Sequence, residues 1–260
     1  MAGVRDFWVR AALVLALLVP VYFLIAAFGA KFGLIDWTIG FGQMTFQWGP
    51  KVLMGVGGFA LIGLLLALLV PPRRGALTAL LALLIPAIGL GYGMYVRQQA
   101  QSIPPIHDIS TDLVDPPEFS AAVVEARAAV TRGNGLDLAN KEANGRSYIE
   151  WQQEAYADIR SVPTGLAPEA AFDIALSLAQ EQGWSIGAAD MEAGRIEATA
   201  ESFWYGFIDD IAIRIRPDGS GARIDMRSVS RVGRSDLGAN AARMRPYLEE
   251  LRVRLQDVES

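Results

Sequence analysis

The most unusual polar segment of the sequence is Arg227-Ser-Val-Ser-Arg-Val-Gly-Arg-Ser-Asp-Leu-Gly-Ala-Asn-Ala-Ala-Arg243. It holds four arginines, three serines and two glycines in 17 residues. It follows an alternating apolar run that is typical of a β-strand, and it leads into a run with helical spacing. A polar junction of this kind either holds a fixed network of hydrogen bonds or binds an anion at the start of the helix.

Four strand signals precede or overlap this stretch, each separated from the next by turn residues. They lie at about 184–188, 195–202, 208–216 and 223–228. Helical spacing indicates helices at 119–130, after Pro168, and at 244–258. The sequence therefore predicts an α+β domain with an antiparallel four-stranded meander flanked by helices, which pack on one face of the sheet.

Smaller features refine this prediction. Residues 148–159 are expected to supply one or two strands. Ser235 or Asp236 is expected to be the N-cap of the last helix, which Pro246 should kink or divide. The turn at 217–220, if it forms a four-residue loop, sets the register of the last two strands.

That register has consequences for the charged residues of the hairpin. It places Ile213 opposite Ile224 on the apolar face and Asp210 opposite Arg227 on the outer face. It also places Asp209 on the apolar face. The sequence thus predicts a structural pair between Asp210 and Arg227.

The first part of the chain has a different composition. Residues 1–96 hold six basic and two acidic residues, whereas residues 97–260 hold 17 basic and 26 acidic ones. Apolar runs at about 8–30, 52–70 and 76–96 each reach the ~20 residues needed to cross a bilayer. We therefore predict a membrane domain, 1–97, with three transmembrane helices, and a soluble extracytoplasmic domain, 98–260.

Arginines in a short turn indicate the orientation of the spans. Arg73 and Arg74 lie between the second and third runs, on the same side as Arg5 and Arg10. The positive-inside rule then places the N-terminus in the cytoplasm and the acidic domain outside it, which in a bacterium is the periplasm. The predicted localisation is the bacterial inner (cytoplasmic) membrane, multi-pass. The alternative for the first run is a cleaved signal peptide.

Two further observations concern the membrane half. The aromatic loop 33–48 either rests at headgroup level or docks a partner. No acid, base or histidine lies deep in any span, which argues against a transporter. The acidic second domain argues against nucleic acid as a partner, and the lack of cysteine excludes disulfides and thiolate sites.

Several motifs together resemble a known family. They are His107-Asp-Ile-Ser-Thr-Asp112, Asp115-Pro-Pro117, Gly183-Trp184, Asp209-Asp210 and Arg227-Ser-x-Ser-Arg-x-Gly-x-Ser-Asp-x-Gly-x-Asn240. Over about residues 104–256 the chain resembles the family catalogued as domain of unknown function 1499. The resemblance implies association with a bacterial or plastid envelope, and it implies no activity.

The unusual polar residues form the candidate site, for which two interpretations stay open. In the first, arginines and carboxylates only hold an irregular loop in place; this network would contain Asp209, Asp210, Arg227 and Arg243. In the second, an anionic group binds near the start of the last helix. The candidate binding residues are Arg231, Arg234, Ser235, Asp236, Asn240, His107, Asp108 and Asp112.

The sequence predicts a membrane-anchored extracytoplasmic binding or scaffolding module of the cell envelope. Its partners would be the lipid bilayer and an anionic ligand, lipid headgroup or envelope protein. No cofactor is indicated, and self-association is left open. The alternative is an envelope hydrolase, in which His107 activates a nearby serine or joins Asp108, Asp112 and Asp209 in a metal site.

Overall fold

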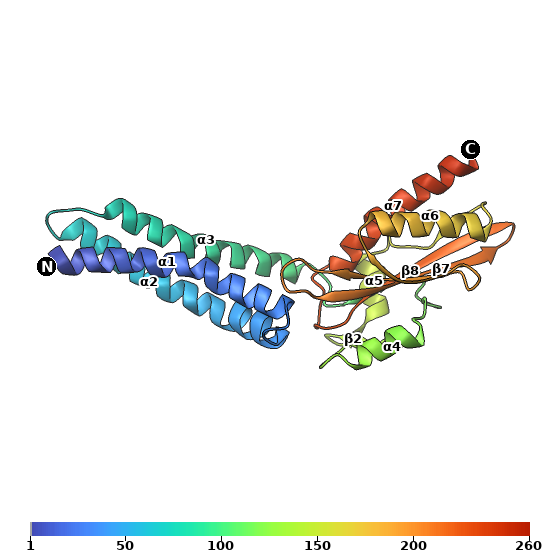
Figure 1. Ribbon diagram of the computed structural model, residues 1–260, viewed down its shortest axis with the longest axis horizontal. Helices are drawn as coiled ribbons and strands as arrows, with labels where there is room; N and C mark the ends of the chain where they lie inside the picture. The colour runs from blue at the N-terminus through green and yellow to red at the C-terminus, as the bar shows by residue number, and fades with distance from the viewer. Residues whose placement is uncertain (1) are drawn as a thin grey trace. The chain divides into compact units, whose positions relative to one another are not determined.

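A computed structural model describes residues 2–260 (Figure 1). The chain divides into two compact units. The first holds the residues up to Gln101 together with Phe203–Gly206, and the second holds Ser102–Ser202 and Phe207–Ser260.

The first unit is built from long apolar helices. They are α1 (Ala2–Lys31), η1 (Thr38–Trp48), α2 (Gly49–Leu69) and α3 (Ala76–Gln101). The helix η1, which has π-helical hydrogen bonding, runs directly into α2 and takes up most of the aromatic loop 33–48. Three helical stretches, Ala2–Lys31, Thr38–Leu69 and Ala76–Gln101, are long and apolar enough to cross a membrane, as the sequence predicts.

Small residues hold these helices together. Ala12, Ala16, Ala60 and Ala82 are fully buried where α1, α2 and α3 meet. A Cβ atom at Gly89 would lie 2.7 Å from Leu53 Cδ2, so the glycine gives the Leu53 side chain of α2 room against α3. Packing through small residues is typical of helices in lipid, because large apolar side chains gain little by turning away from it.

The second unit contains one six-stranded antiparallel sheet. Its strand order is β1-β8-β7-β6-β5, and β4 also pairs with β8. The strands are β1 (Asp108–Ser110), β4 (Val162–Thr164), β5 (Ser185–Asp190), β6 (Arg195–Glu201), β7 (Ile208–Asp218) and β8 (Gly221–Ser230).

The predicted meander is present as β5 to β8, but the expectation of four strands is wrong. The strand β8 has a second edge long enough for two short partners. Its residues Ala222–Ile224 pair with β4, and its residues Arg227–Val229 pair with β1. Both partners come from segments with several prolines, which hide the alternation that marks a strand.

The helices of the second unit are α4 (Ala121–Ala128), α5 (Tyr148–Ala155), α6 (Pro168–Glu181) and α7 (Ala239–Glu259). The short elements η2 (Leu138–Asn140), β2 (Glu142–Ala143) and β3 (Arg146–Ser147) lie between α4 and α5. The predicted strands at 148–159 are wrong, because Ser147 and Glu150 form a capping box that starts α5. The helix α7 is continuous past Pro246, so the expected division does not occur.

The β7–β8 hairpin has a shorter loop than predicted. Asp218 pairs with Gly221, which leaves only Gly219 and Ser220 in the turn, with Gly219 at φ +59°. The register is therefore displaced by two residues, and Ile213 lies opposite Met226. A displacement by two keeps every side chain on its predicted face.

The sheet has one apolar and one ionic face. On the apolar face, Ile211, Ile213 and Met226 are fully buried in one core with residues of α6 and α7. Figure 1 shows α6 and α7 on this side and α4 on the other. The expectation of helices on one face only is thus wrong, because the segment that contains α4 covers the ionic face.

Candidate functional site

The strand β8 distributes the quoted stretch between the two faces of the sheet. Arg227 and Arg231 lie on the ionic face, while Ser228 and Ser230 lie on the face covered by α7. This alternation follows from the period of two in a strand. The two kinds of residue therefore serve two separate hydrogen-bond networks.

The first network on the ionic face joins Arg227 to Asp108. Arg227 donates to both carboxylate oxygens of Asp108 at 2.9 and 2.8 Å, and to the carbonyls of Pro117 and Leu136. Lys141 lies 2.5 Å from the same carboxylate. Burial raises the pKa of Asp108, but the bonds and charges of Arg227 and Lys141 outweigh burial and hold the pKa below its usual value.

The predicted pair between Arg227 and Asp210 is therefore wrong. Asp210, which is 1% exposed, instead accepts bonds from Arg127 of α4 at 2.6 Å and from Arg231 at 2.7 Å. The shifted register moves Arg227 away from Asp210 and places Val229 opposite it. Arg231, a candidate for ligand contact, is consequently held by a buried carboxylate.

A third ionic cluster lies near the hairpin end of the sheet. Asp225 is 0% exposed and accepts bonds from the guanidinium groups of Arg214, Arg216 and Arg223. Asp112, another binding candidate, lies 2.8 Å from Arg223. Its other oxygen accepts the backbone N–H groups of Val114 and Asp115, and hence it stabilises the turn after β1.

On the opposite face, Asn240 connects the first turn of α7 to β8. Its side-chain oxygen accepts from Ser228 at 2.6 Å and from Arg243 at 2.8 Å. Its side-chain nitrogen donates to Ser230 Oγ at 3.0 Å and to the carbonyl of His107 at 3.3 Å. All of the hydrogen-bonding capacity of the buried amide is thus used inside the fold.

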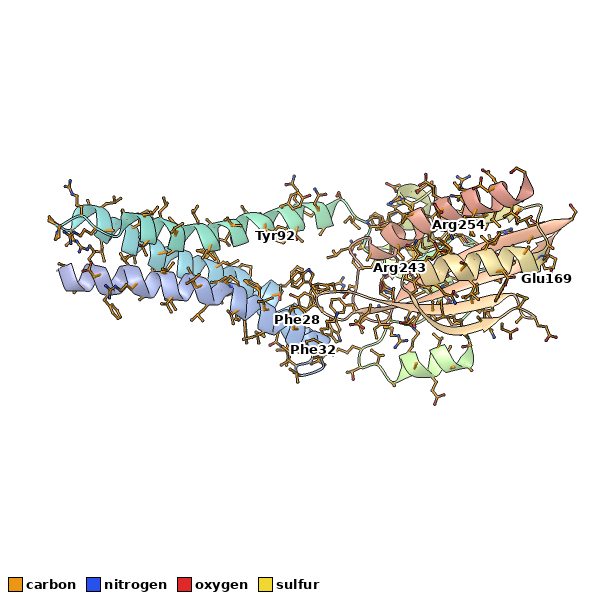
Figure 2. All side chains as sticks on the ribbon, turned by 45° about the horizontal axis from the view of Figure 1, so that its top comes forward. Phe28, Phe32, Tyr92, Glu169, Arg243 and Arg254 are labelled. Atoms are coloured by element: carbon orange, nitrogen blue, oxygen red, sulfur yellow. The ribbon has the colours of Figure 1, made fainter. Side chains whose placement is uncertain are left out.

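Arg243 completes this network. It donates to Asp209 at 2.6 Å, and Figure 2 labels it near the start of α7. The prediction that Asp209 lies on the apolar face is confirmed by its pairing with Ser230 across the hairpin. The carboxylate is acceptable there only because an arginine from α7 reaches it.

The residues just before α7 form a tight turn. The predicted N-cap at Ser235 or Asp236 is wrong, because the helix begins after Gly238, which has φ +83°. Asp236 still satisfies the helix start by accepting from the backbone N–H groups of Gly238 and Asn240 at 2.7 and 3.0 Å. The hydroxyl of Ser235 accepts from Leu237 N–H.

Arg234 and His107 remain after these networks are assigned. Arg234 is exposed and bonds to no carboxylate in residues 2–260. His107 is 6% exposed, and its ring meets the Tyr148 ring edge-on with centroids 5.2 Å apart. Its Nδ1 is buried without a partner.

Both residues interact with Tyr148. Burial and the charges of Asp108 and Asp236 raise the pKa of its hydroxyl to about 12, while the charge of Arg234 lowers it. Lys141 Nζ lies 5.8 Å from the centre of the Tyr148 ring. The charge of Arg234 therefore acts on this buried polar group.

The titration of this cluster follows from burial. Burial and the charge of Lys141 lower the pKa of His107 to about 4, so the imidazole is neutral at physiological pH. Burial and Asp209 raise the pKa of Asp236, although its two backbone hydrogen bonds oppose this shift. The cluster therefore offers a neutral imidazole and one exposed guanidinium.

The geometry does not favour the hydrolase alternative. In the described part of the chain, no serine hydroxyl bonds to His107, and no group of three or more His, Asp or Glu residues could hold a metal ion. Asp108, Asp112 and Asp209 are each bound to an arginine. Two surface hollows lie elsewhere, along α7, and share Arg252 in their lining.

The family described as Protein of unknown function (DUF1499) matches residues 108–251. The chain belongs to this family. The match begins with β1 and ends inside α7, so DUF1499 spans the sheet, its covering helices and all the networks described above. No curated protein matches the chain.

The sequence does not reveal several residues that contact the buried carboxylates and His107 of this DUF1499 domain. Arg127, Lys141 and Tyr148 lie in segments far from the quoted stretch and carry no local pattern. A surplus of buried carboxylates on one strand face is the signal that such distant bases are required. This surplus can be recognised only when the pairing of β8 with β1 and β7 is known.

Proposed function

We propose that the chain is a membrane-anchored binding module of the cell envelope. In this proposal residues 1–97 anchor it in the bacterial inner membrane, and residues 98–260 lie on the extracytoplasmic side. The three apolar helices support the anchor. The arginines in the turn between α2 and α3 support the orientation.

We further propose that the module binds an anionic group, such as a phosphate or a carboxylate, at Arg234. One observation carries this proposal. The other arginines of the quoted stretch, Arg227, Arg231 and Arg243, are each bound to a carboxylate, whereas Arg234 is exposed with no ion pair in residues 2–260. A guanidinium held at the surface suits bidentate binding of an oxyanion.

Neighbouring groups add to the site. The charge of Arg234 acts on the hydroxyl of Tyr148, and the backbone before α7 turns at Gly233 and Gly238, both at positive φ. The carboxylate of Asp236 is occupied in holding the helix start, so that it does not occupy the guanidinium of Arg234.

The test uses the full chain in phosphatidylcholine nanodiscs, with calorimetric titration of inorganic phosphate and of glycerol phosphate as two probes. The second probe represents the headgroup of phosphatidylglycerol. Removal of one charge-assisted contact by Arg234→Gln should weaken binding about 10- to 150-fold, since such bonds contribute roughly 1.5–3 kcal/mol. Preference for glycerol phosphate would favour a lipid headgroup, and equal affinity would favour a free anion.

The matched control is Arg160→Gln. Arg160 is also exposed and lacks an ion pair in the described residues, but it lies in the loop before β4. This variant should bind both probes as the unmodified chain does. Equal binding by Arg234→Gln, or no binding of either probe by the unmodified chain, would contradict the proposal.

A further inference from the structure

The loop between β6 and β7 belongs to the first unit rather than to the sheet. Its residues Phe203–Gly206 cluster with the helices α1 and η1. Lys31 Nζ donates to the carbonyl of Phe203 at 3.0 Å, and the hydroxyls of Thr45 and Tyr205 lie 2.7 Å apart. These contacts fix the loop at the end of α1.

Aromatic rings surround these hydrogen bonds. The ring centre of Phe28 lies 6.1 Å from that of Phe203 and 5.8 Å from that of Trp204. Phe41 of η1 lies 4.9 Å from Tyr205. Figure 2 labels Phe28 and Phe32 at this end of α1.

Gly206 permits the close approach. It has φ +67°, and a Cβ atom there would lie 3.0 Å from Lys31 Cα and 3.2 Å from Lys31 O. A side chain at this position would push the loop away from the backbone of α1. The loop is thus fitted closely to the helix end.

The loop nevertheless leaves large apolar side chains uncovered. Phe203 is 66% and Trp204 is 53% exposed. The same unit exposes other large apolar residues, namely Phe32, Leu34, Phe46 and Trp48. The rings of Phe32 and Phe46 pack on Phe28 and Phe41, the two rings that contact the loop. A group of exposed aromatic residues of this size on a folded chain indicates a surface that something else covers.

The neighbouring surface indicates what covers it. The aromatic group continues the outward-facing apolar surface of α1, whose most apolar window is only 28% buried inside the protein. It ends at Lys31, the cation in the last turn of the helix. Aromatic rings and a lysine at the end of an apolar helix are typical of the boundary between hydrocarbon and headgroups.

We infer that Phe203 and Trp204 insert into the headgroup region of the bilayer. They form one interfacial belt with Phe32, Phe46 and Trp48. The belt is discontinuous in sequence, because one part comes from the spans and the other from a loop between two strands of the family domain. The occupant of this surface is lipid.

The lack of cysteine allows a direct test with the full chain. An environment-sensitive nitrobenzoxadiazole dye is attached to a single cysteine, W204C, in nanodiscs. Nitroxide-bearing lipids and aqueous iodide are then used as separate quenchers. The expected result is strong quenching by lipid nitroxides placed near the headgroup and protection from iodide.

Two reference positions calibrate the measurement. F32C, at the end of α1, should be quenched by lipid as W204C is. E192C lies in the exposed turn before β6, about 23 Å from the loop by the length of that strand, and should be quenched by iodide alone. If W204C behaves as E192C does, or is protected from both quenchers, the inference is wrong.

Discussion

The side-chain oxygen of Asn240 accepts a hydrogen bond of 2.6 Å from the hydroxyl of Ser228, and so ties the first turn of α7 to β8. Neither residue is exposed to solvent. Because water does not reach this hydrogen bond, the position of α7 on the sheet depends on the side-chain amide of Asn240.

Replacement of this amide should cost stability. Asn240→Ala leaves Ser230 Oγ and the carbonyl of His107 with fewer partners, and a buried group without a partner costs about 1–3 kcal/mol. Urea unfolding of the full chain in mild detergent measures the loss. The exposed Gln153→Ala of α5 is the control and should change the free energy of unfolding by less than about 0.5 kcal/mol; a similar small change for Asn240→Ala would refute the structural role.

A buried and an exposed arginine–aspartate ion pair should contribute very differently to the free energy of unfolding. Arg227→Met leaves the fully buried Asp108 with Lys141 as its remaining ion-pair partner, and removal of one member of a buried pair costs about 3–5 kcal/mol. Arg245→Met breaks an exposed pair with Asp158, for which the expected loss is about 0–1 kcal/mol. The comparison uses the same unfolding assay, and equal losses would contradict the assignment of the ionic face.

His107 should make stability depend on pH. Burial lowers its pKa to about 4 in the folded chain, below the unfolded value of 6.5. The unfolded state therefore binds the proton more readily, and stability falls as pH is lowered from about 6.5 to 4. The total loss is roughly 3 kcal/mol, since each unit of pKa corresponds to about 1.4 kcal/mol.

The raised pKa of Asp236 has the opposite sign and partly offsets this loss, because the folded chain binds that proton more readily. The difference between the chain and His107→Gln isolates the histidine. The unfolding free energy of the unmodified chain minus that of His107→Gln should fall as pH is lowered from 8 to 4.5. Parallel curves would show that His107 does not titrate as described.

Membrane orientation has its own test. A reporter that is active only outside the cytoplasm should work after Ser260 and fail when inserted between Arg73 and Arg74, because short basic turns stay on the cytoplasmic side. Activity of both fusions is measured in a bacterial host. The reverse pattern would place the family domain in the cytoplasm.

The strands of the sheet could be predicted where alternation is clean. The isoleucines at 211, 213 and 215 mark β7 correctly, and the faces of the hairpin survive even though its register is displaced by two residues. The loop length could not be predicted, because both a four-residue and a two-residue turn suit Asp218 and Gly219. The four-residue loop would place Arg214 opposite Arg223, whereas the observed register places Arg214 opposite Asp225 and Arg216 opposite Arg223.

The candidate site was less accessible from the sequence. The role of Arg227 was assigned to the wrong carboxylate, because Asp108 reaches β8 only through a three-residue strand that the prolines around it conceal. Arg231 and Arg234 look alike in the sequence, and both were expected to be free. They differ in the structure because Arg231, which lies diagonal to Asp210 across the hairpin, bonds to that carboxylate.

The ionic face of the sheet also limits which substitutions related proteins can accept. Asp108 and Arg227 lie 119 positions apart, yet each is the bidentate ion-pair partner of the other in the buried layer. Loss of either one alone should cost about 3–5 kcal/mol of folding free energy. Related proteins should therefore change both positions together. Arg234 can change alone, because its replacement leaves no buried charge without a partner, and its identity should depend on the ligand of each relative.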